Sequence, residues 1–400
     1  MSGPFQGKRV VLGVTGSIAI YKVVDLASKL TQAGAHVDVL MTRSAQAFVT
    51  PLTFRSVTHQ PVLTDLFDAG SPDAVEHVAI AKQADILVVA PATANILAKL
   101  AGGFADDPIT VTALATLAPV LAAPAMDAGM WDHPAVRANV EALRGRGLAL
   151  AGPAKGHLAS GLEGWGRLVE TPELMGHIAL VLGRTGDLAG RRIVVSAGGT
   201  QEPIDPVRVV ANRSSGKMGY AVAEAARDRG AQAVLVSSAT ALAPPVGVEM
   251  VSVGTADEML DAVEKACAGA DALVMAAAVA DYRPKKRAAQ KMKKTETAWS
   301  LELEQVPERV FKTSPDLIHV GFAAESNDLL KNAKAKLDLK RIDLIAANDI
   351  TQEGSGFGAD TNRVTLLDPG GGVEELPLLP KYDVAWLLLD RVRDLLARKR

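Results

Sequence analysis

Residues 7–16 read Gly-Lys-Arg-Val-Val-Leu-Gly-Val-Thr-Gly, and residues 190–199 read Gly-Arg-Arg-Ile-Val-Val-Ser-Ala-Gly-Gly, so the two stretches match in character position by position. In each stretch an apolar, largely β-branched run ends in a glycine turn. The repetition continues downstream, because residues 34–42 resemble residues 230–238, and residues 84–94 resemble residues 270–280. Each half of the chain is therefore predicted to repeat the order strand, turn, helix, strand.

Short apolar strands that alternate with amphipathic helices indicate parallel sheets covered by helices on both faces. Turn residues gather at positions 183–190, Gly-Arg-Thr-Gly-Asp-Leu-Ala-Gly, directly after a helical pattern at 174–182. We predict an α/β protein with two doubly wound, Rossmann-like, three-layer domains, residues 1–186 and residues 187–400. Ligands of such domains bind beyond the carboxyl ends of the strands.

The composition narrows the class of protein. A chain of 400 residues has room for two or three domains. Lys and Arg total 43 against 45 for Asp and Glu, and aromatic residues make up 4%, which disfavours nucleic acid as a partner. The single cysteine, Cys267, excludes a disulfide framework or a cysteine metal cluster. The sequence contains neither a signal-type stretch nor a bilayer-length apolar run, so we expect a cytoplasmic protein without a membrane partner.

The first turn of each half lacks the dinucleotide-binding pattern, because the glycines at 13 and 16 are three apart rather than two, and residues 198–203 fit no better. This disfavours an NAD dehydrogenase. The first turn can still offer N–H groups and a hydroxyl to one phosphate, from Gly16, Ser17 and Ile18. Thr42 ends the next strand on the same edge. Thr93 and Asn95 follow a later strand and could hold a planar polar ring. A phosphate and a ring together suggest a mononucleotide such as FMN.

A second glycine-rich junction spans residues 194–220, where Asp205, Arg208 and an Asn-Arg-Ser-Ser-Gly-Lys-Met-Gly motif that begins at Asn212 precede an alanine-rich helix. The free N–H groups and the dipole of a helix start suit an anion. Alternatively, the glycines only shape turns and allow close helix packing. Six polar residues in one junction fit that alternative poorly, so we predict a phosphate-handling site.

Two further features of the first half are less specific. His77 opens an alanine-rich helix, and a lone histidine there is more often structural than catalytic. Residues 124–134 combine two methionines, a tryptophan and Asp127 without helical or strand periodicity. Such a segment suits a loop over a cofactor.

Over nearly its whole length the chain resembles the bacterial bifunctional phosphopantothenoylcysteine decarboxylases and phosphopantothenate–cysteine ligases of coenzyme A biosynthesis. In the first half the resemblance rests on Thr-Gly-Ser-Ile-Ala at 15–19, His77, Pro-Ala-Thr-Ala-Asn at 91–95 and Pro-Ala-Met at 124–126. In the second half it rests on Asp-Pro-Val-Arg at 205–208, the motif at 212–219, Ala-Ala-Val-Ala-Asp-Tyr-Arg at 277–283, Lys-Met-Lys-Lys at 291–294 and Gly-Phe-Ala-Ala-Glu at 321–325.

The resemblance implies that the first domain is an FMN-dependent decarboxylase, in which the flavin oxidises the substrate thiol, CO2 leaves, and the same flavin reduces the resulting enethiolate. It implies a catalytic role for His77 in oxidation and decarboxylation. Two catalytic positions depart from the family pattern. Asp127 stands where many members have asparagine, and its negative charge would repel a substrate carboxylate.

Ser160 stands where familiar members have the cysteine that donates a proton during enethiol reduction. Either another group supplies that proton, with His157 and a water as candidates, or oxidised product is released. We predict that reduction survives, because the flanking residues Gly161, Gly164, Gly166 and Arg167 are kept.

The resemblance implies that the second domain joins 4'-phosphopantothenate to cysteine, with CTP activating the carboxylate as an acyl-cytidylate and Mg²⁺ accompanying the triphosphate. It assigns Asn212 to acyl-cytidylate formation, Lys291 to completion of the amide, and Asp281 to the nucleotide and metal. The basic run around Lys291 is of a kind that usually forms a solvated face, but its place after a strand suggests a mobile flap. The other expected CTP contacts are Met275, Ala276, Ala277, Phe322, Lys336 and Lys340, the two lysines lying one helical turn apart.

Two alternatives concern the first half: a regulatory flavoprotein, or a peptidyl-cysteine decarboxylase that stops at the enethiol. The intact second half argues against both. The resemblance also implies a homo-oligomer with trimeric flavin domains and dimeric ligase domains, up to a dodecamer. Residues 307–321 form a shorter segment than in familiar members, and the sequence leaves the helix that borders the nucleotide undefined.

Overall fold

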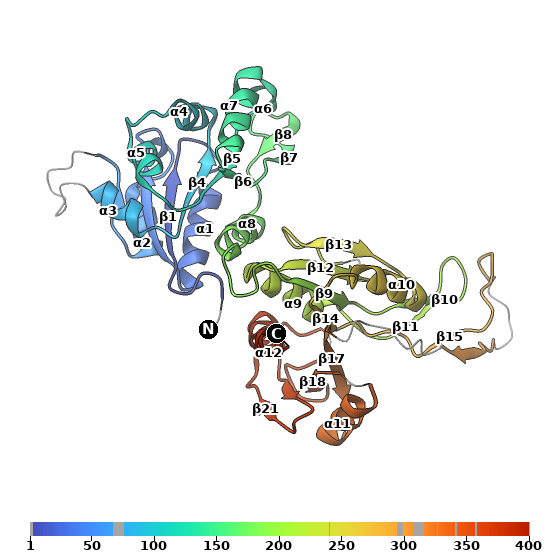
Figure 1. The fold of residues 1–400 in the computed structure, drawn as a ribbon. Helices are drawn as coiled ribbons and strands as arrows, with labels where there is room; N and C mark the ends of the chain where they lie inside the picture. The colour runs from blue at the N-terminus through green and yellow to red at the C-terminus, as the bar shows by residue number, and fades with distance from the viewer. Residues whose placement is uncertain are drawn as a thin grey trace. The chain divides into compact units, whose positions relative to one another are not determined.

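The computed structural model describes residues 3–66, 76–239, 241–293, 299–306, 316–325, 327–340, 342–356 and 358–399, without the side chains of Glu76 and His77. The chain divides into two compact units, Gly3–Leu182 and Gly183–Arg400 (Figure 1). Each unit contains one large sheet with helices on both faces, which confirms the predicted fold class. Among the described residues no helix combines the length and the apolar character needed to cross a bilayer.

The sheet of the first unit has six parallel strands in the order β3-β2-β1-β4-β5-β6. Their bounds are Arg9–Val14 (β1), His36–Met41 (β2), Val62–Leu63 (β3), Ile86–Ala92 (β4), Val120–Pro124 (β5) and Ala149–Leu150 (β6). The strand order reverses between β1 and β4. In a doubly wound sheet this is the place where a ligand binds.

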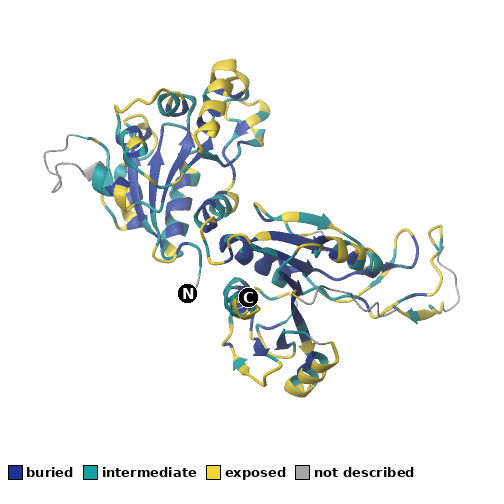
Figure 2. Ribbon diagram, viewed as in Figure 1, coloured by how far each residue is buried: buried dark blue, intermediate teal, exposed yellow. Residues whose placement is uncertain are grey.

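Alternate residues of β1 face two separate cores. Val10, Leu12 and Val14 pack with the helices α1 (Ile20–Gln32), α2 (Pro51–Thr58) and α8 (Thr171–Gly183). Val11 packs on the opposite face with α3 (Glu76–Gln83), α4 (Ala94–Gly102), α5 (Pro108–Ala115) and α7 (Pro134–Gly145). The strands are buried on both faces, as Figure 2 shows, which explains why they read as continuous apolar runs.

The sheet of the second unit repeats this order and adds two antiparallel strands: β13-β12-β9-β14-β17-β18-β20-β21. The strand bounds are Arg192–Ala197 (β9), Gln232–Ser237 (β12), Glu249–Ser252 (β13), Ala272–Met275 (β14), Ile318–Glu325 (β17), Leu344–Asp349 (β18), Thr365–Leu367 (β20) and Val373–Glu375 (β21). Helices α9 (Lys217–Asp228) and α12 (Lys381–Arg398) cover one face, and α10 (Ala256–Ala266) covers the other. Helix α11 (Leu329–Lys340) packs on β17 and β18.

The internal repeat extends to register and hydrogen bonds. Asp85 and Asp271 occupy equivalent positions at the starts of β4 and β14. The carboxylate of Asp85 accepts the N–H of Arg9 at 2.7 Å, and that of Asp271 accepts the N–H of Arg192 at 2.8 Å. The same polar contact therefore joins two neighbouring strands in each half, β1 with β4 and β9 with β14.

Several short antiparallel strand pairs lie outside the two sheets. They pair β7 (Ala154–His157) with β8 (Glu163–Arg167), β10 (Gln201–Pro203) with β11 (Val209–Ala211), β15 (Tyr282–Pro284) with β16 (Leu303–Gln305), and β19 (Thr361–Asn362) with β22 (Leu379–Pro380). The hairpin strands β10 and β15 contact each other at one end of the second unit (Figure 1). The sequence did not predict these strand pairs, because two to five residues are too few to establish a period.

Candidate functional sites

The first candidate site lies beyond the carboxyl ends of β1 and β4, where the strand order reverses. The hydroxyl of Thr15, directly after β1, donates to the carbonyl of Pro91 at 2.5 Å and lies 3.4 Å from the hydroxyl of Thr93. Thr93 also caps α4 by accepting the N–H of Ile96. The two strand ends are therefore joined by side-chain hydroxyls at the switch point of the sheet.

The turn after β1 has the shape of an anion site. A Cβ on Gly16 would lie 2.6 Å from Cβ of Ser44, so only glycine lets this turn approach the loop after β2. Thr42 begins that loop, and its hydroxyl accepts the N–H of Ala45 at 3.3 Å. Within the described chain no acceptor is assigned to the N–H groups of Ser17 and Ile18, which therefore face solvent or a ligand.

The hairpin of β7 and β8 docks on the short helix α6 (Ala128–Asp132) beside this strand edge. The N–H of Met126 donates to the carbonyl of Gly166 at 2.9 Å. The hydroxyl of Ser160 donates to Oδ2 of Asp127 at 2.6 Å, and Oδ1 of Asp127 accepts the N–H of Gly129 at 2.9 Å. These two hydrogen bonds, that of Ser160 first, lower the pKa of the Asp127 carboxyl, which stays an anion near neutral pH.

The remaining predicted residues of the first site are less closely connected. Asn95 is exposed in the first turn of α4, and Ile18 is 59% exposed in the turn before α1. The backbone of His77 lies in the first turn of α3, while its side chain lies outside what the structure describes. The structure thus joins Asp127 to Ser160 and groups Gly16 with Thr42, and it leaves the position of the His77 imidazole undescribed.

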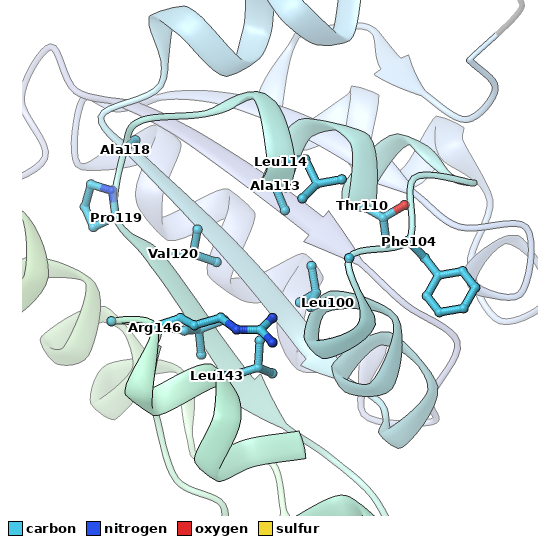
Figure 3. A pocket seen from close by; sticks show the side chains of 13 residues that line it. Leu100, Phe104, Thr110, Ala113, Leu114, Ala118, Pro119, Val120, Leu143 and Arg146 are labelled. Atoms are coloured by element: carbon cyan, nitrogen blue, oxygen red, sulfur yellow. The ribbon is translucent and has the colours of Figure 1, made fainter. Parts of the chain in front are cut away.

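An apolar cavity of about 260 Å³ lies at the opposite edge of the first sheet (Figure 3). It is lined by side chains from α4, α5 and α7 and by Val120, the first residue of β5. The guanidinium of Arg146 lies across it and donates to the carbonyl of Ala101 at 2.7 Å. Because the amino end of β5 borders this cavity, it is separate from the strand edge that carries the first candidate site.

The second candidate site lies beyond the carboxyl ends of β9 and β14. After β9 the chain turns at Gly198, whose φ of +86° favours glycine, and the carbonyl of Gly198 accepts the N–H of Ala278 at 2.8 Å. The buried hydroxyl of Thr200 accepts the N–H of Ala280 at 2.9 Å. One step earlier, the hydroxyl of Ser196 accepts the N–H of Ala277 at 3.2 Å. The segment that follows Met275 and Ala276 is therefore held at three points against the glycine turn.

Asn212 is brought to this segment from the other side. Its side-chain amide donates to the carbonyl of Val279 at 2.9 Å, two residues before Asp281. The carbonyl of Asn212 also lies close to Gly199, where an added Cβ would approach it to 2.5 Å. The motif at 212–219, the glycine turn and the 277–281 segment thus meet at one edge of the sheet.

Cationic side chains reach the same edge from α11. The ammonium of Lys336 donates to the carbonyl of Phe322, on β17, at 2.7 Å. Burial lowers the pKa of Lys336, and neighbouring Lys340 adds to this, while Glu325 and Asp281 act in the opposite direction. Lys291, by contrast, is exposed in the segment that follows β15.

Sequence reasoning missed one polar cluster beside this site. Lys217, in the first turn of α9, donates to the carboxylate of Asp360 at 2.6 Å and to the carbonyl of Gly358 at 3.1 Å. The largely buried ammonium of Lys381 donates to the neighbouring carbonyl of Ala359. Asp360 is 143 positions from Lys217 and belongs to no motif, so only the folded chain brings them together.

Comparisons with known proteins agree with this architecture. Residues 2–182 match a family model described as Flavoprotein, and residues 188–396 match one described as DNA/pantothenate metabolism flavoprotein C-terminal domain. A Bacillus subtilis protein called coenzyme A biosynthesis bifunctional protein CoaBC is 44% identical over 394 residues, covering 97% of each chain. A Mycobacterium tuberculosis protein of the same description is 45% identical over 409 residues, covering 98% of this chain and 97% of its own.

Solved structures similar to the separate halves include the C-terminal domain of a CoaBC protein, at 39% identity and a TM-score of 0.46, which covers 53% of this chain and 99% of its own. They also include a PPC decarboxylase with a cysteine replaced by serine, complexed with pantothenoylaminoethenethiol, at 32% identity and a TM-score of 0.40, which covers 44% of this chain and 98% of its own.

The fold and the two family matches define an enzyme in which a flavoprotein domain precedes a pantothenate-metabolism domain. The full-length relatives narrow this class to one family. The chain belongs to the CoaBC family of bifunctional coenzyme A biosynthesis enzymes, which combine phosphopantothenoylcysteine decarboxylase and phosphopantothenate–cysteine ligase activities. The family expected from the sequence motifs is therefore confirmed.

Proposed function

We propose that this chain catalyses two consecutive cytoplasmic steps of coenzyme A biosynthesis. Residues 187–400 ligate 4'-phosphopantothenate to cysteine through a CTP-derived acyl-cytidylate, and residues 1–186 decarboxylate the product to 4'-phosphopantetheine with FMN. Two observations carry the proposal. A bifunctional relative is 44% identical to this chain over 97% of its length, and a polar site lies at the carboxyl edge of each sheet.

The first site fits FMN. The tight turn that Gly16 allows and the N–H groups of Ser17 and Ile18 suit the phosphate, and Thr42, Thr93 and Asn95 are assigned to the nucleotide and its ring. When bound, the flavin supplies the oxidation of the thiol and the later reduction of the enethiolate. His77 is assigned to proton handling beside the thiol.

Asp127 and Ser160 act as one unit in this proposal. A serine hydroxyl can donate one hydrogen bond, and in this site the Asp127 carboxylate accepts that hydrogen bond. Ser160 therefore presents lone pairs rather than a proton to a substrate, and it is not the acid of enethiol reduction. That proton comes from a water or from His157, which lies on the same hairpin.

The second site fits a nucleoside triphosphate. We assign the base to a border formed by Met275, Ala276, Ala277 and Phe322, and the phosphates to Lys336 and Lys340. Asn212 orients the carboxylate as it is activated, and Lys291 assists amide formation. Among the described residues no group of three or more His, Cys, Asp or Glu side chains converges, so Mg²⁺ would be held by Asp281 together with phosphate oxygens.

A single assay tests the proposal. Purified protein is given CTP, 4'-phosphopantothenate and cysteine, and pyrophosphate and CO2 are followed separately. We expect pyrophosphate first, CO2 second, and a flavin absorbance spectrum in the purified protein. Pyrophosphate without CO2 would leave the ligase alone and revive the regulatory alternative for the first half. Release of enethiol as the only product would favour the peptidyl-cysteine decarboxylase type.

We also propose that the chain is a homo-oligomer in which flavin domains associate as trimers and ligase domains as dimers, up to a dodecamer. Exposed apolar side chains beside the Gly16 turn support self-association of the first unit: Ile18, Tyr21, Phe48 and Leu52. Native mass spectrometry of the full chain tests this, and a monomer at micromolar concentration would contradict it.

A further inference from the structure

The apolar cavity of about 260 Å³ in the first unit is shaped by the carboxyl ends of two helices (Figure 3). Helix α4 is followed by Gly103 at a φ of +72°, and helix α7 is followed two residues later by Gly147 at a φ of +91°. After each glycine the next residue donates its N–H to a carbonyl of the last helical turn, at 3.0 Å for Phe104 and 3.1 Å for Leu148. Both helix ends thus bring an apolar side chain to the cavity wall.

The interior of the cavity suits a hydrocarbon. Ala113 and Leu114 of α5, Val120 of β5 and the buried side chain of Leu143 of α7 complete the wall. Thr110 also lines it, but its hydroxyl donates to the carbonyl of Asp107 at 3.0 Å and is committed to capping α5. A ligand therefore meets mainly aliphatic surface inside, as in most small-molecule sites.

Arg146 supplies a polar group at the edge of this surface. Its guanidinium lies across the cavity, and Nη1 donates to the carbonyl of Ala101 at 2.7 Å (Figure 3). Among the described residues this is the one acceptor assigned to its side chain, and no carboxylate pairs with it. Arg144, one turn-residue away on the same helix end, is by contrast paired with Glu141 at 2.9 Å. The remaining N–H groups of Arg146 are thus available to a ligand acceptor.

Capping of α4 alone does not account for this arrangement. Capping the Ala101 carbonyl uses one N–H, whereas a guanidinium presents a planar fork that matches the two oxygens of a carboxylate. The carbonyl ends of α4 and α7 carry partial negative charge, so an anion at the cavity edge is stable only in contact with Arg146. Capping and ligand binding use different N–H groups and can occur together.

We propose that this cavity is a binding site for a small monocarboxylate with a hydrocarbon body, which enters the space between α4, α5, α7 and the start of β5 while its carboxylate pairs with Arg146. A cavity of about 150 Å³ holds a benzene molecule, so this one accommodates roughly eight to ten carbon atoms. The site lies at the sheet edge away from the Gly16 turn, and its occupant is neither a substrate nor the cofactor of the proposed function.

Two variants separate the polar and apolar parts of the site. Arg146→Met keeps an aliphatic side chain and removes the guanidinium. Ala113→Phe adds a ring to the wall and fills the cavity. Arg144→Met is the matched control, because it removes an exposed arginine from the same helix end, where the side chain pairs with Glu141 and does not line the cavity.

The measurement is calorimetric titration of the full-length protein with octanoate, octanol or acetate. The wild type should bind octanoate saturably, bind octanol about tenfold more weakly, and show no saturable binding of acetate. Loss of a charge-assisted hydrogen bond should weaken octanoate binding about tenfold in Arg146→Met and leave octanol binding unchanged. Arg144→Met should match the wild type, and Ala113→Phe should bind neither octanoate nor octanol.

Several results would overturn the proposal. Equal affinity for octanoate and octanol, or unchanged octanoate binding in Arg146→Met, would show that Arg146 does not hold the carboxylate. Octanoate binding that survives in folded Ala113→Phe would place the ligand elsewhere; if this variant does not fold, Arg146→Met decides alone. Absence of saturable binding by the wild type would refute the site outright. The titrations use no CTP and no turnover, so their outcome is independent of the proposed activities.

Discussion

At the residue scale, a short hydrogen bond of the first site joins Asp127 to Ser160, 33 positions apart, with 2.6 Å between their oxygens. The sequence identified both residues as departures from the family pattern, but as separate ones. Their contact could not be predicted, because it depends on how the β7–β8 hairpin folds back onto α6. The Asp127 carboxylate accepts the Ser160 hydroxyl on Oδ2 and the Gly129 N–H on Oδ1, so each of its oxygens has a donor.

This pairing predicts the behaviour of Ser160→Ala. The Ser160 hydroxyl already donates its hydrogen bond to Asp127, so removal of this hydroxyl should not change the protonation step. The thiol product should therefore dominate over the enethiol, as in the wild type. The total rate can fall through loosening of the hairpin, so the readout is the product ratio by mass spectrometry at equal flavin content. Enethiol accumulation in Ser160→Ala alone would identify Ser160 as the proton donor after all.

The Asp205 carboxylate, which accepts the backbone N–H groups of Val207, Arg208 and Met292, predicts a pH dependence of stability. Hydrogen bonds lower the folded-state pKa of Asp205 below its ordinary value of 3.8. Its stabilising contribution is therefore complete above that value and is lost as the pH falls through the folded-state pKa. The difference in melting temperature between wild type and Asp205→Asn should be constant from about pH 8 to about pH 5 and shrink below about pH 4. A difference that widens on acidification would contradict this assignment.

At the element scale, long elements were predictable and short ones were not. The strands β1, β4, β9 and β14 carry apolar runs and repeat each other, so the sequence located them. Hairpins such as β10–β11 and β15–β16 consist of three-residue strands held by contacts from elsewhere, among them the ion pair of Arg283 with Asp257 at 3.0 Å. Such strands are set by tertiary context rather than by local pattern.

The packing of α9 on β9 gives a prediction at this scale. A Cβ on Gly219 would lie 2.5 Å from Cβ of Ala197 and 2.8 Å from the carbonyl oxygen of Ser196. Gly219→Ala should therefore push α9 off the strand, lower the free energy of unfolding by about 1–3 kcal/mol and reduce ligase activity. Denaturant unfolding measures the first effect. Gly356→Ala, a change into open space in the same unit, should have little effect, and equal stability of the two variants would refute the packing argument.

At the scale of the whole molecule, the repeated strand order was predictable because both halves carry the same pattern of apolar runs and turns. The first three parallel strands, the reversal and the next three follow one order in both sheets. What differs between the halves came from outside the repeat: the antiparallel strands β20 and β21, and the Lys217–Asp360 pair. Fold repetition therefore placed both sites at strand ends, but only side chains beyond the repeat distinguish them chemically.

The proposed self-association of the first unit also belongs to this scale. Tyr21 and Leu52 are 63% and 67% exposed on α1 and α2, two helices that contact each other next to the Gly16 turn. A charge in such a patch costs little in a monomer but much in an interface that excludes water. Leu52→Glu should therefore leave the full chain as a species no larger than twice its mass of 41.8 kDa, with weakened flavin retention, by native mass spectrometry and absorbance.

The matched control is Leu117→Glu, because Leu117 is fully exposed in the same unit but precedes the amino end of β5, at the edge away from the Gly16 turn. It should keep the wild-type mass and the wild-type flavin content. If Leu52→Glu keeps the full assembly while Leu117→Glu disrupts it, the association surface lies at the edge that carries the apolar cavity. If Leu52→Glu loses the assembly but retains flavin, the turn binds the cofactor without help from a neighbouring subunit.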